Sequence, residues 1–396
     1  MKQVLQTPAG PTVREVPPPA VPRGNVLVRN EFSVISSGTE RAFRENSEKS
    51  IVARVAERPE LARKAVERVR REGLRSTLET VRGSLPGESP TGYSCAGVVV
   101  ETGSAVRGLS VGDRVACAGA GHANHASLVS VPSNLCAKVP DGVPMDAAAL
   151  TTIASIALHG VRIADVRLGE SVAVIGCGLV GQITVRLLVA SGATVFAVDL
   201  DQARVDAAVA AGARHGVTVG PDAAEAILDA TGGVGVDAAL VTAAAPTSDP
   251  LLLATDVARD RGAVVLVGDA PIDVPRDAFF QKELSFRVSR SYGPGRYDPD
   301  YEERGLDYPI AYVRWTEQRN MQAVLDLQAA GALRLADLIE EVLPIDRAAD
   351  AYARLSLPPD ERPRGALALS YPADDVTPAR PVAAAEPAPE ALGPGA

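Results

Sequence analysis

Residues 171–199 constrain the fold more than any other stretch of this chain. They read SVAVIGCGLVGQITVRLLVASGATVFAVD. A short apolar run over 171–175 is followed by glycines at G-x-G-x-x-G spacing, by a helical pattern over 179–190, and by a second β-rich run that ends at Asp199. Strand, glycine turn, helix and strand in this order predict a βαβ unit within a doubly wound α/β domain.

The three glycines have distinct expected roles. Gly176 allows a tight turn, Gly178 lets the backbone approach a pyrophosphate, and Gly181 lets the helix pack closely against the strand. The first helical residues, Leu179 and Val180, then offer free N–H groups and a partial positive charge to phosphates. The pattern therefore predicts a dinucleotide site; the alternative is a glycine turn in an α/β domain without a ligand.

An acidic residue closes this unit. Asp199 lies 23 residues after Gly176, where its carboxylate can accept hydrogen bonds from an adenosine ribose. A carboxylate there would repel a 2′-phosphate, so the sequence favours NAD over NADP. Leu200, the next residue, is expected to lie beside the same ribose.

The rest of the chain alternates in character. Strand-like runs broken by Pro and Gly over 1–40 and 91–140 predict a small antiparallel barrel. After Asp199, further helical patterns over 202–211, 223–230 and 250–259 each precede a strand, and 286–289 is expected to be the last strand of the sheet. The intervening 41–88 is predicted to be a helical insertion, and 372–396, rich in Ala, Pro, Glu and Gly, a disordered tail.

Composition narrows the class of protein. A net charge of −9 argues against nucleic acid as the main partner. The N-terminal residues MKQVLQTPAG have no signal-peptide core and no apolar stretch is long enough to span a bilayer. The four cysteines are scattered, so we expect no disulfide framework and a cytoplasmic location.

Several segments in order resemble one family. VRNEFSVISSGTE, GYSCAGVVVETGSAVRGLSVGDRV and AAALTTIASIALHGV, followed by the glycine-rich unit, are similar to the medium-chain alcohol dehydrogenase superfamily. The resemblance implies a GroES-like β-barrel catalytic domain built from 1–153 and 291–371 around a Rossmann domain over 154–290. It also implies a homodimer through the Rossmann sheets.

One branch of the superfamily is closer still. The insertion after SSGTER and the later SYGPGRYD and YVRWTEQRNM resemble bi-domain oxidoreductases, in which this unit is often fused to a second, sugar-dehydrogenase-like domain. The chain stops where that domain would start. The resemblance therefore implies a carbohydrate-like substrate and a possible separate second dehydrogenase component.

The chain departs from the family at the catalytic zinc. Where relatives have Cys, His, and Cys or Asp as ligands, it has Ser37, Tyr93 and Thr152. None supplies a thiolate, imidazole or carboxylate, so we predict no zinc site. Spacing alone could suit metal binding at His122 and His125, but a third ligand is not evident. The structural zinc lobe is absent too.

Without a metal, hydroxyl groups must handle the proton. Tyr93 takes the place of a zinc ligand and is the first candidate for proton donor or acceptor, the alternative being a wall of the vacated pocket. Thr39 matches the hydroxyl that relays protons in the zinc enzymes, and a Thr39–ribose relay is the second candidate. Glu40 and Ser37 are placed to orient substrate hydroxyls.

The resemblance also implies residues for cofactor and substrate. Arg204 is expected near the adenosine, Thr242 in the cofactor cleft and Gly268 close to the nicotinamide. Substrate contacts are expected from Tyr292, Tyr297 and Trp315, aromatic residues in a chain that is only 4% aromatic, and from Thr152. Burial in a subunit interface is the alternative for the aromatic residues.

Three remaining residues have open roles. Arg290 or Arg296 could bind an anionic substituent or simply lie at the surface, and His159 is expected to be a packed core residue.

The sequence thus predicts an NAD(H)-dependent, zinc-independent oxidoreductase that interconverts a secondary alcohol and a ketone on a polyhydroxylated small molecule. A zinc-free reductase of conjugated C=C bonds, and a non-catalytic cofactor-binding subunit, are the alternatives.

Overall fold

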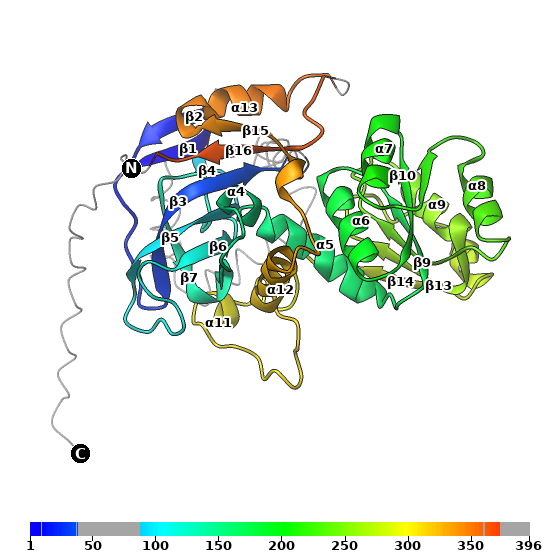
Figure 1. Ribbon diagram of the computed structural model, residues 1–396, viewed down its shortest axis with the longest axis horizontal. Helices are drawn as coiled ribbons and strands as arrows, with labels where there is room; N and C mark the ends of the chain where they lie inside the picture. The colour runs from blue at the N-terminus through cyan, green and yellow to red at the C-terminus, as the bar shows by residue number, and fades with distance from the viewer. Residues whose placement is uncertain (9, 37, 39–87, 359–360, 373–396) are drawn as a thin grey trace, which may run out of the picture.

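The computed structural model describes residues 1–8, 10–36, 38, 88–358 and 361–372 (Figure 1). Three residues proposed above for catalysis, Ser37, Thr39 and Glu40, lie outside the described residues, as do nearly all of the helical insertion and the tail from 373 onward. Two sheets occupy the two ends of the molecule, and helix α5 (Thr151–Ala164) lies between them.

The first sheet is the doubly wound parallel sheet that the sequence predicted. Among the described residues six strands form it in the order β11-β10-β9-β12-β13-β14, with β9 and β12 at the switch point. In chain order the strands are β9 (Ser171–Ile175), β10 (Thr194–Asp199), β11 (His215–Thr218), β12 (Val236–Val241), β13 (Ala258–Leu266) and β14 (Ser285–Val288). The predicted α/β fold class is confirmed.

Helices connect these strands and cover the sheet. They are α6 (Leu179–Ala190), α7 (Gln202–Ala210), α8 (Ala223–Ala230), α9 (Asp249–Val257) and the short α10 (Arg276–Phe280). Helix α7 starts where the Asp201 side chain accepts a hydrogen bond from the backbone of Ala203, which satisfies one of the unpaired N–H groups of the first turn. The strands between them are almost entirely buried, as expected of a parallel sheet covered on both faces.

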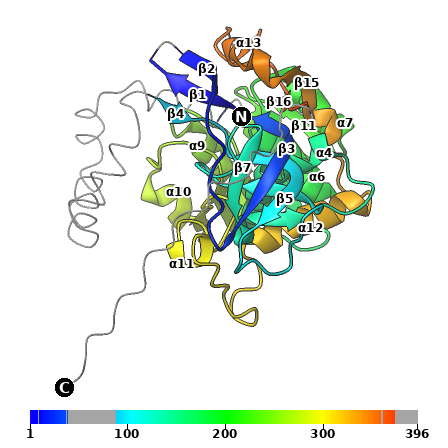
Figure 2. The ribbon, with the colours of Figure 1, turned by 90° about the vertical axis from the view of Figure 1, so that its left-hand side faces the viewer.

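The second sheet corresponds to the β-barrel that the resemblance implied. Within the described part of the chain it has strands β3 (Asn25–Ile35), β5 (Ser94–Thr102), β6 (Arg114–Ala118), β7 (Leu128–Pro132), β8 (Cys136–Lys138), β15 (Ile339–Pro344) and β16 (Ala366–Ser370). A smaller sheet of β1 (Lys2–Thr7), β2 (Gly10–Glu15) and β4 (Ser89–Pro90) lies beside it. Figure 2 looks onto β3, which pairs with β5, β7 and β16 and so joins both ends of the chain.

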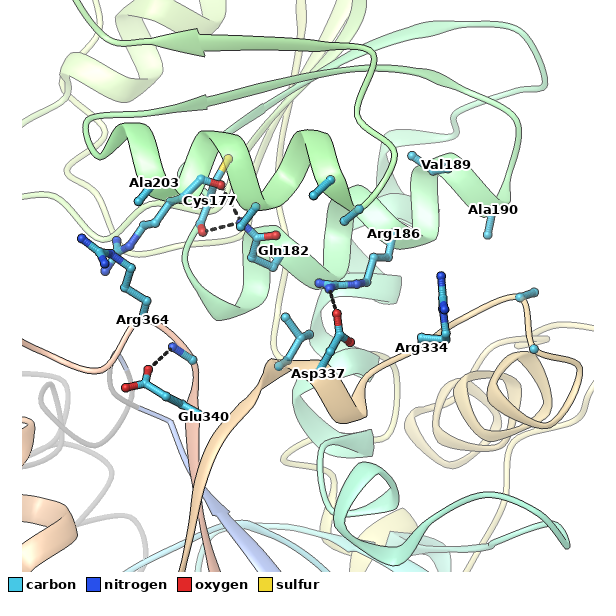
Figure 3. Close-up of a pocket in the computed structure, with 18 residues that line it drawn as sticks. Cys177, Gln182, Arg186, Val189, Ala190, Ala203, Arg334, Asp337, Glu340 and Arg364 are labelled. Carbon is cyan, nitrogen blue, oxygen red and sulfur yellow. Dashed lines mark hydrogen bonds and ion pairs between the residues drawn. The ribbon is translucent and has the colours of Figure 1, made fainter.

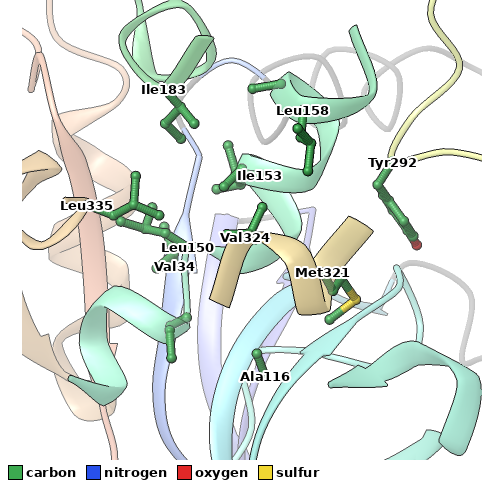
Figure 4. Close-up of a cluster of buried hydrophobic side chains, with 14 of the residues drawn as sticks. Val34, Ala116, Leu150, Ile153, Leu158, Ile183, Tyr292, Met321, Val324 and Leu335 are labelled. Carbon is green, nitrogen blue, oxygen red and sulfur yellow. The ribbon is translucent and has the colours of Figure 1, made fainter. Parts of the chain in front are cut away.

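A continuous apolar core connects the barrel to the parallel sheet. Helix α5 and helix α12 (Glu317–Ala329) pack together between them, with Ile153, Leu158, Met321 and Val324 facing the shared cluster (Figure 4). Fully burying one such side chain stabilises the fold by roughly 1.5–3 kcal/mol. Within the described ranges, the remaining α-helices α4 (Met145–Ala148), α11 (Pro299–Glu302) and α13 (Ala348–Arg354) lie on the barrel side.

Some predicted elements have different limits in the structure. The helix expected over 250–259 ends at Val257, because Ala258 adopts an extended conformation (φ −67°, ψ 138°) and begins β13. Ala258 pairs with Val236, so ladder hydrogen bonding takes over from the helix at that point. In the described residues we find no helix with the length and apolar character needed to cross a membrane.

Candidate functional site

The glycine turn between β9 and α6 has the geometry that a dinucleotide phosphate requires. Gly176 has a φ of +101°, which a residue with a side chain rarely adopts. A Cβ at Gly181 would clash with the carbonyl oxygen of Gly176, so helix and turn are in direct contact. At Gly178, by contrast, a Cβ would meet nothing within 4 Å, which leaves open space in front of the backbone. The backbone of the turn therefore leaves room for a pyrophosphate to bind close to it.

Helix α6 presents its first turn to that open space. Gly178 is its N-cap residue, and the N–H groups of Leu179, Val180 and Gly181 precede the first intrahelical hydrogen bond, from the Gln182 amide to the Gly178 carbonyl (2.8 Å). These donors and the helix dipole favour an anion.

Asp199 supports the glycine turn directly. Its carboxylate accepts a hydrogen bond from the Cys177 amide (2.6 Å) and another from the Asp201 amide (2.9 Å). A carboxylate has about four acceptor positions, so two remain for ribose hydroxyls. Leu200 beside it is exposed. Burial, together with Asp199, raises the pKa of the Cys177 thiol to about 12, so this thiol is not a nucleophile near neutral pH.

Thr242 and Gly268 follow the next two strands at the same edge of the sheet. The Thr242 hydroxyl donates to the Gly176 carbonyl (2.5 Å), which fixes the turn. A Cβ at Gly268 would clash with the carbonyl oxygen of Ala243, so two backbone segments touch there. Both residues therefore shape the carboxyl edge of the sheet where ligands bind in such folds.

A cavity of about 560 Å³ extends from the glycine turn along α6 and α7 to the barrel segment 331–340 (Figure 3). Arg204 and Arg364 are among its lining residues, and Arg186 pairs there with Asp337 (2.5 Å). The Gln182 side chain donates to the carbonyls of Cys177 (3.1 Å) and Arg204 (2.8 Å), linking turn and α7. The cavity thus offers guanidinium groups beside the turn.

Tyr93 lies just before β5 and belongs to the buried core, with 9% of its surface exposed. Its carbonyl accepts the Gly119 amide (3.0 Å), which fixes the backbone at the barrel. The preceding Gly92 has a φ of +91°, and a Cβ there would lie 2.8 Å from the His125 ring. The ring of His125 therefore packs against the backbone that carries Tyr93.

Of the other two positions that the resemblance aligned with zinc ligands, one makes a hydrogen bond within the fold and one lies outside the described residues. The buried Thr152 hydroxyl donates to the Cys117 carbonyl (3.1 Å), and Ser37 is not described. His125 Nδ1 shares a hydrogen bond with the Ser33 hydroxyl (2.7 Å). No three His, Cys, Asp or Glu side chains are grouped to hold a metal ion in the ranges that the structure covers.

The aromatic residues of the segment 291–320 are not in one place. Tyr292 is buried at the margin of the core, with its hydroxyl directed away from the apolar cluster (Figure 4). Tyr297 is 55% exposed. The ring of Trp315 contacts the guanidinium groups of Arg162 (3.3 Å to the ring centroid) and Arg314 (3.9 Å). Burial raises the pKa of the Tyr292 hydroxyl well above its usual range, so that hydroxyl stays protonated.

Tyr292 and Arg296, both named from the sequence, lie in a buried polar cluster whose other members the sequence did not suggest. Arg296 pairs with Glu302 (2.6 Å), and both side chains are nearly buried. Asn320 donates to the Tyr292 carbonyl (2.9 Å). Glu317 is fully buried, and neither of its carboxyl oxygens has a hydrogen-bond partner among the described residues. The only sequence signal for this cluster was the mixture of acidic, basic and aromatic residues over 291–320.

Glu317 should make the stability of the protein dependent on pH. Burial, and then the nearby Glu302, raise the pKa of its carboxyl from 4.5 to about 9. Unfolding therefore releases a proton between these pH values, and the free energy of unfolding falls as the pH rises through this window. For Glu317→Gln, we expect urea unfolding to show a gain over the wild type that grows from pH 5 to pH 8, by up to about 1.4 kcal/mol per pH unit.

Glu303→Gln serves as the control for this comparison, because Glu303 is exposed and close in the chain. The free energy of unfolding of Glu303→Gln should have the same pH dependence as that of the wild type. A parallel pH dependence for the wild type and Glu317→Gln would show that Glu317 is ionised in the folded protein.

Comparisons with known proteins agree with this architecture. Residues 180–304 match a family model described as "Zinc-binding dehydrogenase". Residues 71–141 match a second model, described as "Alcohol dehydrogenase GroES-like domain". The probable D-xylulose reductase A of Aspergillus fumigatus is 31% identical over 249 residues, which is 54% of this chain and 69% of that protein. The D-guloside 3-dehydrogenase of Escherichia coli K12 is 28% identical over 68% of this chain and 75% of its own.

Solved structures share the fold. An alcohol dehydrogenase of Escherichia coli CFT073 (rspB), solved in complex with NADH, superimposes with a TM-score of 0.70 over 94% of this chain and 99% of its own, at 18% identity. Sheet order, glycine turn and sequence relatives lead to one conclusion. The chain belongs to the medium-chain dehydrogenase/reductase superfamily and is an oxidoreductase of the alcohol dehydrogenase type.

Proposed function

We propose that this protein interconverts a secondary alcohol and a ketone on a polyhydroxylated small molecule, using NAD(H) and no zinc. The observation that carries the proposal is the carboxyl edge of the parallel sheet, where an open glycine turn and an acidic residue lie side by side. Gly178 faces open space and Asp199 ends the adjacent strand. This is the arrangement that holds a dinucleotide and positions its reactive end for hydride transfer.

The relatives support the substrate class. The names of the two sequence relatives refer to D-xylulose and to a D-guloside, both polyhydroxylated. Each of these names describes interconversion of an alcohol and a carbonyl group. A sugar or related polyol is therefore the substrate class that we propose for this chain.

The choice of NAD rests on Asp199. Its carboxylate accepts the Cys177 amide at the turn and would lie against the 2′ position of an adenosine ribose bound there. A 2′-phosphate at that position would be repelled.

The proposal of catalysis without zinc rests on the chemical groups at the positions that align with zinc ligands. Tyr93 and Thr152 occupy two of the positions where the zinc enzymes have metal ligands, and neither a phenol nor a threonine hydroxyl is a preferred zinc ligand. The Thr152 hydroxyl already donates to the Cys117 carbonyl. These residues do not fit a catalytic zinc, and no step is assigned to one.

The proton is then handled by the protein's own hydroxyl groups. The nicotinamide ring, when bound, supplies or accepts the hydride. In the reductive direction Tyr93 donates its phenolic proton to the substrate oxygen as the new C–H bond forms, and in the oxidative direction it takes that proton back. In the alternative route, the proton passes between substrate and solvent through the Thr39 hydroxyl and the cofactor ribose; in either route Ser37 and Glu40 orient the substrate hydroxyls.

A ketose assay combined with metal analysis tests this proposal. Purified protein should oxidise NADH with D-xylulose or D-fructose, contain far less than one zinc ion per chain, and keep its rate after dialysis against a strong chelator. Loss of activity on chelation, restored by added zinc, would refute the zinc-free mechanism. NADH oxidation with a conjugated enone but with no ketose would refute the reaction type.

A further inference from the structure

The order of strands in the parallel sheet defines where the substrate lies. Reading along the carboxyl edge, Asp199 ends β10, the glycine turn follows β9, Thr242 follows β12, Gly268 follows β13, and Arg290 follows β14. The four strand spacings from β10 to β14 amount to about 19 Å. A dinucleotide with its adenosine at Asp199 therefore has its reactive end on the β13–β14 side. Arg290 and the loop after it are on that same side.

Four of the acidic side chains in this loop already have partners, whereas the exposed Glu303 makes no ion pair among the described residues. The carboxylate of Glu302 pairs with Arg296 at 2.6 Å, in a pair whose two side chains are 11% and 12% exposed. Three further acidic side chains are engaged in the same way, as the pairs Asp300–Arg304, Asp307–Arg319 and Asp298–Tyr308. Arg296 is thus neutralised within the fold and is not the cation that a substrate would meet.

Arg290 differs from Arg296 both in its exposure to solvent and in its ion pairing. It is exposed, and within the described ranges it makes no ion pair with a carboxylate. Its guanidinium carbon lies 4.7 Å from the ring centroid of Tyr297, and Arg296 contacts the same ring at 3.9 Å. Arg290 is therefore a cation without an acidic partner, held beside an exposed aromatic ring.

The backbone holds that ring in place at a conformational cost. Tyr297 has a φ of +67° and Ser291 a φ of +51°, a region that residues with side chains rarely occupy. Their hydroxyl oxygens lie 3.4 Å apart. Such strain persists only where the surrounding structure enforces it, and it concentrates at ligand sites.

Positive charge without acidic partners recurs at Trp315. Arg162 and Arg314 both contact its ring, and neither pairs with a carboxylate of the described residues. Burial, and then Arg314, lower the pKa of Arg162 to about 10. Arg162 and Arg314 are therefore two further guanidinium groups beside an aromatic ring that have no carboxylate partner among the described residues.

We propose that Arg290 binds an anionic substituent of the substrate, a carboxylate or a phosphate on a polyhydroxylated ring or chain, while the exposed ring of Tyr297 contacts its carbon skeleton. The inference rests on the proposed function, whose substrate class it narrows from polyols in general to acidic or phosphorylated ones. A planar guanidinium forms two parallel hydrogen bonds with either anion.

Three ketoses that differ only at C6 test the proposal: D-fructose, D-fructuronate and D-fructose 6-phosphate, each with NADH. The wild type should show a KM at least tenfold lower for one of the anionic ketoses than for D-fructose, and that KM should rise with added NaCl. The preferred anion, carboxylate or phosphate, identifies the substituent.

Arg290→Gln should raise KM for the preferred anionic ketose at least tenfold, leave its kcat within about twofold, and leave both KM for D-fructose and the dissociation constant of NADH unchanged. Arg290→Lys should recover part of the loss. Arg276→Gln is the matched control, because Arg276 also contacts an aromatic ring, that of Phe280 at 4.1 Å, but is the first residue of α10, ahead of β14 in the chain. It should change none of these values.

Equal KM values for the three ketoses in the wild type, or an unchanged KM for the anionic ketoses in Arg290→Gln, would overturn the inference. Turnover of D-fructose in that case would leave the proposed function standing. A lack of NADH oxidation with all three ketoses would overturn both.

Discussion

Replacing Tyr93 with Phe is expected to lower kcat by about 100-fold and to leave the affinity for NADH unchanged. A positioned acid or base contributes about 10²- to 10⁴-fold to a proton-transfer step, and the substitution removes only the hydroxyl group. Tyr93 is part of the buried core, so the phenyl ring of the variant still fills its place. Steady-state kinetics with a ketose, together with titration of NADH binding by fluorescence, measure the two quantities.

Tyr312→Phe is the matched control, because the Tyr312 side chain is 88% exposed and the same hydroxyl is removed. It should keep full activity. If Tyr93→Phe also keeps full activity with unchanged pH dependence, Tyr93 is a wall of the vacated metal pocket and the proton must pass through another group.

Replacing Asp199 with Ala should reduce the preference for NADH over NADPH by about 10- to 100-fold, since hydrogen bonds to a charged group contribute roughly 1.5–3 kcal/mol. The structure adds a second effect. The Asp199 carboxylate also accepts the Cys177 amide, and an unpaired buried amide costs about 1–3 kcal/mol. The variant should therefore be less stable in urea as well as less selective.

Asp199→Asn separates these two effects. Its amide oxygen can still accept the Cys177 N–H, so this variant should lose selectivity while keeping most of its stability. Asp229→Ala, which removes an exposed carboxylate on α8, is the control and should change neither. Unchanged NADH preference in both Asp199 variants would contradict the cofactor assignment.

The parts of the fold with strong local patterns could be predicted from the sequence. The glycine spacing over 176–181, with an apolar strand before it and a helical pattern after it, predicted a βαβ unit, and helix α6 has the expected limits of 179 and 190. Ala223–Ala230 likewise matches its predicted range. In these segments local propensity and tertiary packing favour the same structure.

Contacts that depend on tertiary structure could not be predicted in the same way. The helical pattern over 250–259 extends past Val257, but pairing with β12 turns Ala258 into a strand residue. Neither the hydrogen bond from Cys177 to Asp199 nor the burial of Glu317 follows from spacing along the chain. Likewise, the two arginines that the sequence left equivalent differ because Glu302 folds back onto Arg296 and leaves Arg290 without an acidic partner.

The pairing of β16 with β3 has a consequence for synthesis of the protein. All six strands of the parallel sheet lie between Ser171 and Val288, so the nascent chain can complete that sheet as one continuous unit. Strand β3, in contrast, meets β16 through pairs such as Phe32 with Ser370, which are more than 300 residues apart. The edge of β3 at Phe32–Ile35 therefore stays unpaired on the ribosome until β16 has been translated, and the barrel is completed after the parallel sheet.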